Sequence, residues 1–256
     1  KLKFDEMIQK AESFGVKRVA TGHYASIIKH PSGKFLVRRG RDRWKDQSYF
    51  LFNLSKDQLS RLEFPLGDMD KNEVRERARQ LGLNVAEKAE SHEICFIPDN
   101  DYPKFIAKQL NGDAFKQGDI VNSKGELLGK HQGYPAFTIG QRKGIKVSDK
   151  SPLYVIKINP DQNEIIVGPR EKLGKKLISL ENLNLLVDKS EFEKEIFVKV
   201  RSTGKLLDAN INFLDENKAE VNLKIAEDGI SPGQACVFYN KDNLGFKVLG
   251  GGWIKN

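Results

Sequence analysis

The chain of 256 residues is 39% hydrophobic and 30% charged, with a net charge of +8. This length favours two or three domains, and no run of the sequence approaches the roughly 18 apolar residues that a membrane-spanning helix needs. We therefore expect a cytoplasmic protein without a membrane partner. Two cysteines are too few for a disulfide framework. The surplus of Lys and Arg favours a polyanionic partner.

The first segment reads as the helix, strand and loop of an α/β sheet. A helix is indicated by apolar residues at helical spacing, namely Phe4, Met7, Ile8, Ala11 and Phe14, and Gly15 is expected to end it. A short strand over 16–20 follows. Ligands of such sheets bind beyond the carboxyl ends of strands, where Gly22 and His23 stand. Because the chain begins with Lys1 inside this pattern, we expect a further segment upstream.

The next part predicts a second strand, a polar loop and helices. The strand covers Lys34–Arg38, and the loop covers Arg41–Gln47. Ser55 with Gln58, and Asp70 with Glu73, have the spacing of capping boxes, so each pair predicts a helix start. The second helix is expected to stop at Gly82, and residues 53–112 to be largely helical, with 91–97 as a short extended piece.

The rest of the chain is expected to be β-structure. From Gly118 we expect strands at Ile120–Val121 and Phe137–Ile139, then a hairpin from Leu153–Ile156 to Ile165–Val167. Beyond residue 171 apolar residues alternate in short runs separated by glycine and asparagine. This pattern predicts a small antiparallel barrel.

Cys95 lies in the segment Ser91-His92-Glu93-Ile94-Cys95-Phe96-Ile97, and its local context leaves two readings open. It could be a buried apolar residue or a reactive thiol. A zinc motif is excluded because Phe96 stands where HExxH needs its second His. A phosphate loop is also excluded at Gly125–His131, which has one residue too few between its glycines, and the chain contains no GxGxxG.

The run His131–Gly144 combines closely spaced glycines with the cationic pair Arg142 and Lys143. Such a run could bring its backbone close to a phosphate, or it could be a tight turn with a solvated tip. Spacing alone leaves both open.

Several motifs, in the same order along the whole chain, resemble the bacterial tRNA 2-thiouridylase family (MnmA, also called TrmU). They are Ala20–Tyr24, Lys45–Phe50, Phe64–Gly67, Ile94–Ile97, His131–Gly144, Pro232–Gln234 and Gly250–Gly252. The resemblance implies a fold that is α/β plus β, with three domains. These would be the remainder of a Rossmann-like PP-loop ATP pyrophosphatase domain (1–66), a mixed central domain (67–170) and a C-terminal antiparallel β-barrel (171–256).

The resemblance implies an enzyme that uses ATP, with Mg2+, to adenylate the wobble uridine, U34, and then replaces its C2 oxygen by sulfur from a persulfide on Cys95. The family's SGGxDS loop for ATP is not in this chain, so we expect it upstream. Implied partners are tRNA of the Lys, Glu and Gln type and a persulfide sulfur-donor protein. The alternative is a noncatalytic tRNA-binding module. No metal ligands and no methyl-donor loop are expected.

The resemblance also assigns binding residues. Gly22 corresponds to a position at the nucleotide, and the tRNA contacts it implies are His23, Lys45, Asp46, Gln47, Arg142, Lys143, Arg201, Ser202 and Gln234. Two alternatives stay open: His23 could be a capped loop histidine, and Asp46 could be the N-cap of a helix. Cys236 matches no catalytic position and alternates with Phe238, which predicts a core residue.

Overall fold

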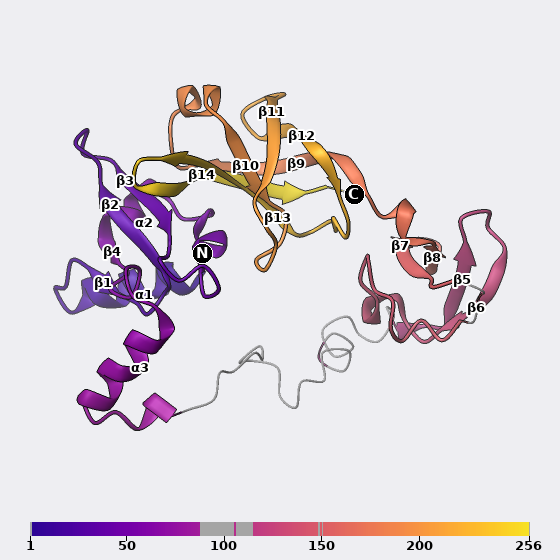
Figure 1. The fold of residues 1–256 in the computed structure, drawn as a ribbon, viewed down its shortest axis with the longest axis horizontal. Coiled ribbons are helices and arrows are strands. Elements are labelled where there is room, and N and C mark those ends of the chain that lie inside the picture. Colours follow the sequence, from indigo (N-terminus) through magenta and orange to yellow (C-terminus); the bar gives the residue numbers. More distant parts are fainter. Residues whose placement is uncertain (1, 88–104, 106–114, 148, 150, 256) are drawn as a thin grey trace. The chain divides into compact units, whose positions relative to one another are not determined.

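The computed structural model describes residues 2–87, 105, 115–147, 149 and 151–255 (Figure 1). The chain forms two compact units. The first unit takes in residues 1–88, 176–225 and 232–256, so it combines both ends of the sequence. The second takes in residues 89–175 and 226–231.

The first unit opens with the expected helix, strand and loop. Its N-terminal elements are α1 (Leu2–Ser13), β1 (Val19–Ala20), β2 (Ala25–Lys29), β3 (Phe35–Arg39), η1 (Ser48–Leu51), α2 (Lys56–Arg61), β4 (Leu62–Glu63), α3 (Lys71–Gln80) and η2 (Asn84–Glu87). Phe4 and Ile8 form the buried face of α1, and Gly15, at φ 71°, ends the helix as predicted. β1 pairs in parallel with β4. The expected second strand is β3, but it is one arm of a hairpin whose other arm, β2, the sequence reading missed.

Both capping boxes are present. Ser55 caps α2 and Asp70 caps α3, and in each case the third residue of the helix, Gln58 or Glu73, bonds back to the backbone of the cap. Gly82, at φ 68°, follows the end of α3 as expected. Helix α3 contributes no buried residue.

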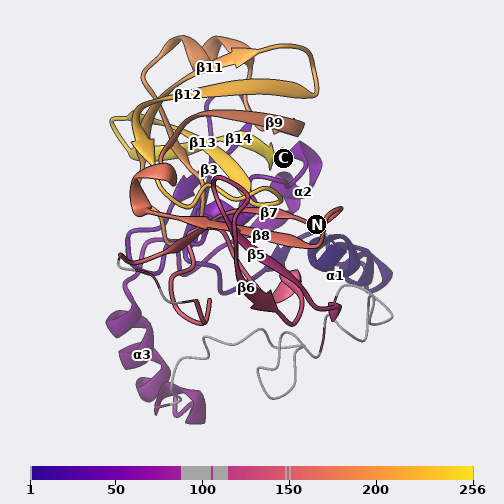
Figure 2. The same cartoon turned by 90° about the vertical axis from the view of Figure 1, so that its right-hand side faces the viewer.

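Six strands of the first unit close into a barrel (Figures 1 and 2). They are β9 (Lys175–Leu185), β10 (Ile196–Lys199), β11 (Leu207–Phe213), β12 (Lys218–Glu227), β13 (Ala235–Asp242) and β14 (Gly245–Ile254), with η7 (Lys189–Glu193) between β9 and β10. The ring runs β13, β10, β11, β12, β9, β14 and back to β13. β14 also pairs with β3 through Lys247 and Arg38, so the hairpin extends the sheet of the barrel. The predicted barrel is therefore confirmed. Its first strand, β9, and its last strand, β14, were not predicted.

One hydrophobic core serves both parts of the first unit. Phe4 and Leu59 of the N-terminal helices share it with Val237 and Tyr239 of β13. Leu59, Val237 and Tyr239 are fully buried. The N-terminal elements and the barrel are thus packed as a single body.

The second unit contains a four-stranded sheet of β5 (Gly118–Asn122), β6 (Leu127–His131), β7 (Tyr154–Asn159) and β8 (Glu164–Gly168), in the order β6, β5, β8, β7. The short helices η5 (Tyr134–Ala136) and η6 (Arg170–Lys172) adjoin these strands in sequence. The predicted hairpin is confirmed as β7 and β8, which pair antiparallel. Ile120, Val155, Ile165 and Val167 form the centre of its core.

The strand predicted at Phe137–Ile139 is wrong. The segment is a turn in which Gly140 has φ 86° and Gln141 N–H donates to the carbonyl of Thr138. Phe137 instead packs edge-on against the buried ring of His131. Nδ1 of His131 accepts the N–H of Gly133, so Nε2 carries the proton and donates to the carbonyl of Asn163. His131 is thus a structural residue that holds the chain as it enters the turn.

Candidate functional site

The loop after β1 places His23 at the carboxyl end of the parallel pair β1 and β4. Its ring lies 5.4 Å from the ring of Phe4 and 5.4 Å from that of Phe64, and its Nδ1 lies 2.7 Å from the hydroxyl of Thr21. Burial, and then the charge of Lys3, lower the pKa of His23, which favours a neutral imidazole at pH 7. A neutral, partly exposed ring suits hydrogen bonding to a base more than pairing with a phosphate.

Gly22, in the same loop, is exposed. A Cβ at this position would meet only the side chain of Leu66, at 3.6 Å, so no steric demand of the fold requires glycine here. The exposed backbone is open to a ligand at the end of β1.

Asp46 and Gln47 hold the polar loop together from inside. The carboxylate of Asp46, 1% exposed, accepts from Nε of Arg39 at 2.6 Å and from the N–H groups of Gly40 and Ser48. Oε1 of Gln47 accepts the N–H of Tyr24, and its own N–H donates to the carbonyl of Tyr24. The loop is therefore tied to the His23 loop. The cap position of η1 is Gln47, one residue later than the alternative reading supposed, although Asp46 does bond to Ser48.

Lys199, at the end of β10, fixes the loop that carries Arg201 and Ser202. It is 3% exposed, and its Nζ donates to the carbonyl of Ser202 at 2.7 Å. Burial lowers the pKa of Lys199, the nearby charge of Asp46 raises it, and that of Arg39 lowers it again. The charges of Asp46 and Arg39 thus act on Lys199, whose hydrogen bond goes to the carbonyl of Ser202.

Three of the predicted tRNA contacts, Arg201, Ser202 and Gln234, lie toward the same end of the barrel. β10 and β13 are antiparallel with Lys199 opposite Val237, which brings the loop of Arg201 and Ser202 to the start of β13, where Gln234 is exposed. The hydroxyl of Tyr49 donates to the carbonyl of Ala235, and Ser48 contacts Tyr239. These bonds attach the segment that follows Lys45 and Gln47 to the first half and the middle of β13.

Arg142 and Lys143 lie in the second unit, at an exposed turn. The side chain of Gln141 bridges the turn, since its Oε1 accepts from Thr138 N–H and its Nε2 donates to the carbonyl of Lys143. Gly140 and Gly144 both have positive φ, at 86° and 82°. A hollow of about 420 Å³ adjoins Arg142 and is lined also by Lys146 and Asp149. The geometry agrees with both readings left open above, the turn and the phosphate contact.

The two cysteines differ in what the structure says of them. Cys95 lies outside the described residues. Cys236 is fully buried in β13, and burial raises the pKa of its thiol. The prediction that Cys236 is a core residue is therefore confirmed.

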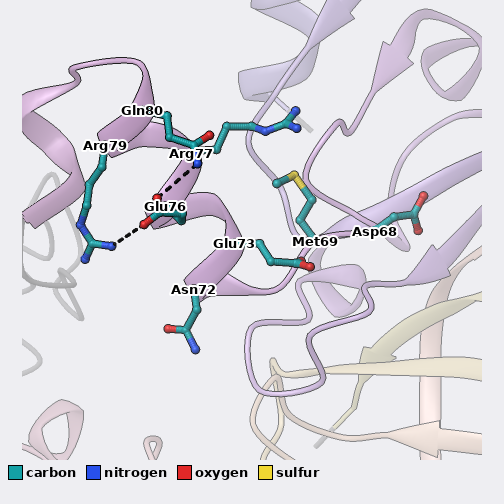
Figure 3. A pocket seen from close by; sticks show the side chains of 8 residues that line it. All are labelled: Asp68, Met69, Asn72, Glu73, Glu76, Arg77, Arg79 and Gln80. Carbon is teal, nitrogen blue, oxygen red and sulfur yellow. Dashed lines mark hydrogen bonds and ion pairs between the residues drawn. The ribbon is translucent and has the colours of Figure 1, made fainter.

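A hollow of about 580 Å³ lies along α3 (Figure 3). Its lining includes Met69, Asn72, Glu76 and Arg79, and Glu76 pairs with Arg79 at 3.1 Å. All of these come from one exposed helix and the turn before it, and they include no nucleophile. We find no catalytic arrangement there.

Within the described part of the chain, no group of three or more His, Cys, Asp or Glu side chains could hold a metal ion. Over the same residues, no helix has the length and apolarity to cross a membrane.

Three family models match the chain in succession. They are described as the tRNA methyl transferase HUP domain (residues 1–99), the tRNA methyl transferase PRC-barrel domain (103–169) and the aminomethyltransferase beta-barrel domain (175–254). A tRNA-specific 2-thiouridylase MnmA of Acidithiobacillus ferrooxidans is 42% identical over 255 residues, covering 99% of this chain and 71% of its own length. The MnmA of Methylorubrum extorquens is 43% identical, covering 99% and 67%. The chain belongs to the MnmA family.

The family match confirms the resemblance seen in the sequence, and with the barrel it confirms the fold class. The three family models place a HUP domain first, a PRC-barrel second and a β-barrel last. This order agrees with the expected order of an α/β part, a mixed part and a barrel. The domain boundaries at residues 66 and 170 stay a prediction.

Sequence reasoning missed the residues that support the MnmA-type loops. The sequence analysis gave Arg39 and Lys199 no role, and it interpreted Asp46, which binds Arg39, as a tRNA contact. Lys199 carried no signal in the sequence, because a residue between Val198 and Val200 is expected on the polar face of an alternating strand.

Proposed function

We propose that this chain transfers sulfur to C2 of the wobble uridine, U34, of tRNA. The observation that carries the proposal is its 42% identity, over 99% of its length, to a protein named tRNA-specific 2-thiouridylase. The family-model descriptions speak of methyl transfer, but the relatives' names speak of thiolation, and the sequence has no glycine-rich methyl-donor loop.

The shared end of the barrel supports tRNA as the substrate. Arg201, Ser202 and Gln234 lie toward one end of the barrel, and Lys45 and Gln47 lie in a loop of the same unit that is tied to the His23 loop. Cations there would meet phosphates, and the amides and His23 would meet base edges. Arg142 and Lys143 would add phosphate contacts from the second unit. Asp46, enclosed by its three donors, would act by holding the loop in shape.

The resemblance of Ile94–Ile97 to the family's motif makes Cys95 the proposed sulfur carrier, and the chemistry of the reaction explains why one is needed. The C2 oxygen of uridine is a poor leaving group, so its attack on the α-phosphate of ATP, with release of pyrophosphate, would make AMP the leaving group. The terminal sulfur of a Cys95 persulfide would then attack C2 and expel AMP. A second thiol would cleave the remaining sulfur–sulfur bond and form a disulfide with Cys95. Cys236, enclosed in the barrel, is excluded from that part.

ATP, with Mg2+, would approach Gly22. Its exposed backbone at the end of β1 fits a nucleotide, and the space around it also admits an alanine. Gly22→Ala should therefore raise the KM for ATP and leave the unfolding temperature unchanged. An unchanged KM would remove Gly22 from the nucleotide site.

Further parts of the proposal follow from the family. They are a persulfide donor protein, tRNAs of the Lys, Glu and Gln type, a cytoplasmic location, and three domains with boundaries at residues 66 and 170. A donor is needed because the reaction consumes one sulfur atom per tRNA.

The test is complementation of a bacterium that lacks its own 2-thiouridylase, followed by mass spectrometry of nucleosides from its tRNA. We expect 2-thiouridine to return with the gene that encodes this chain. The alternative, a noncatalytic tRNA-binding module, predicts tRNA binding without 2-thiouridine and without tRNA-dependent release of AMP. Formation of methylated uridine in its place would contradict both.

A further inference from the structure

Trp44 is exposed to an unusual degree. Its side chain is 96% exposed, more than any other large hydrophobic side chain in the described part of the chain. Tryptophan is on average among the more buried residues, because its ring gains much from leaving water. An exposed tryptophan therefore calls for a binding partner.

The exposure does not come from a loose segment. The N–H groups of Trp44 and Lys45 both donate to Oδ1 of Asp42, at 3.0 and 3.2 Å, and Oδ2 of Asp42 accepts the N–H of Lys71 at the start of α3. On the other side, Asp46 is fixed by its three donors. The loop presents the indole ring from a backbone that is anchored before and after it.

The loop around Trp44 is polar and contains three cations and two carboxylates. The loop reads Arg41-Asp42-Arg43-Trp44-Lys45-Asp46-Gln47, so no other apolar side chain adjoins the ring in sequence. Burial, and then Arg39, lower the pKa of Arg43, with a counteracting effect of Asp46. Protein interfaces centre on contiguous apolar patches, which this loop lacks. Single-stranded nucleic acid is bound by aromatic rings among cations, since bases stack on the ring while phosphates pair with the charges.

We propose that Trp44 is a stacking platform for an unpaired base of the RNA substrate. The inference rests on the proposed function, because it takes tRNA to be the molecule that reaches Lys45 and Gln47. It adds a contact that distinguishes unpaired from paired RNA. A helical stem cannot offer the face of an internal base to Trp44, whereas a loop nucleotide can.

The chain allows a direct readout because it has two tryptophans. Trp253 is 37% exposed and packs on Phe52, so Trp253→Phe leaves Trp44 as the single tryptophan, whose emission can be excited selectively. We expect an anticodon stem–loop RNA to quench this emission to saturation, and a blunt RNA duplex with the same number of phosphates to leave it nearly unchanged. Circular dichroism of Trp253→Phe checks its fold.

Affinities of Trp44 variants complete the test. Trp44→Ala should weaken stem–loop binding about tenfold, and Trp44→Phe should retain most of it, while duplex affinity stays the same in both. Equal stem–loop affinity for Trp44→Ala and the unchanged protein would overturn the proposal, and so would an equal loss for stem–loop and duplex. Quenching that depends on protein concentration without RNA would overturn it in favour of self-association.

Failure of this inference is distinguishable from failure of the proposed function. If Trp44→Ala binds the stem–loop normally while 2-thiouridine still forms in the complementation assay, the platform is refuted and the function stands. If the unchanged protein binds neither RNA, tRNA as substrate is refuted and the platform with it.

Discussion

Nε of Arg39 donates a 2.6 Å hydrogen bond to a carboxylate oxygen of Asp46, and both side chains are enclosed. Arg39 ends β3, whereas Asp46 lies in the loop that the sequence reading expected to touch tRNA. A residue of that loop therefore acts inward. A mutation can test whether Asp46 stabilises the loop or contacts RNA directly.

Asp46→Asn should lower the free energy of unfolding by about 3 kcal/mol, because it leaves Arg39 buried without its counter-charge. It should also weaken tRNA binding several-fold by loosening the loop. Chemical denaturation and filter binding measure the two effects. Asp208→Asn, which breaks an exposed pair with Lys224, is the matched control and should change stability by less than about 0.5 kcal/mol. Full stability of Asp46→Asn with lost binding would mean that Asp46 contacts RNA directly.

Cys95→Ser should abolish 2-thiouridine formation and leave tRNA affinity nearly intact, because the thiol acts in the chemistry. Nucleoside mass spectrometry and filter binding check both. Cys236→Ala is the control: it should keep activity and lose about 1 kcal/mol of stability through a small packing defect in β13. Substantial thiolation by Cys95→Ser would remove Cys95 from the mechanism.

Arg142 and Lys143 should contribute to the salt dependence of tRNA binding. Each phosphate contact releases counterions, so replacing both residues by alanine should make the slope of log affinity against log salt shallower by about 1 to 2. Alanine at Lys175 and Lys176 removes the same charge from another exposed pair of neighbours. If both double variants change the slope equally, the turn has no special role.

Glu191 should make stability depend on acid pH. Its carboxylate accepts from Nζ of Lys194 and of buried Lys247, and these bonds lower its pKa from 4.5 to about 2. Between these values the unfolded chain binds more protons, so the stabilisation is complete above pH 4.5 and is lost as the pH falls toward 2. Denaturation from pH 7 to pH 2 should show this loss.

Glu191→Gln should flatten that acid dependence and cost about 2 kcal/mol at pH 7, since Lys247 loses its charged partner. Glu216→Gln is the control because Glu216 is 92% exposed in its pair with Lys189 and should have little effect. An unchanged pH profile for Glu191→Gln would place the acid sensitivity elsewhere.

Local interactions explain what the sequence revealed. The caps at Ser55 and Asp70 involve residues three positions apart, so the sequence alone contains both partners. The stop at Gly82 is equally local. By contrast, Tyr49 and Ala235 are far apart in the chain, and only the folded first unit brings the hydroxyl of Tyr49 to the carbonyl of Ala235. A prediction from spacing could not join them.

Strand β14 was missed because its glycines disfavour a strand by propensity. The structure supplies the reason for one of them: a Cβ at Gly251 would lie 2.7 Å from the carbonyl oxygen of Cys236 and 2.7 Å from the ring of Phe52. The strand needs glycine where the barrel wall and the N-terminal elements press together. The error at Phe137–Ile139 has the opposite origin, since apolar residues there serve a turn and not a strand.

The pairing of Lys247 with Arg38 also bears on how the chain folds. A ribosome completes the hairpin β2 and β3 long before it makes β14, the strand on which the hairpin rests. During synthesis this segment remains with part of its core exposed until β14 emerges from the ribosome. Contacts so distant in sequence slow folding, and an unfinished edge invites wrong pairing. Cells would therefore gain from a chaperone that covers this nascent segment until β14 has been made.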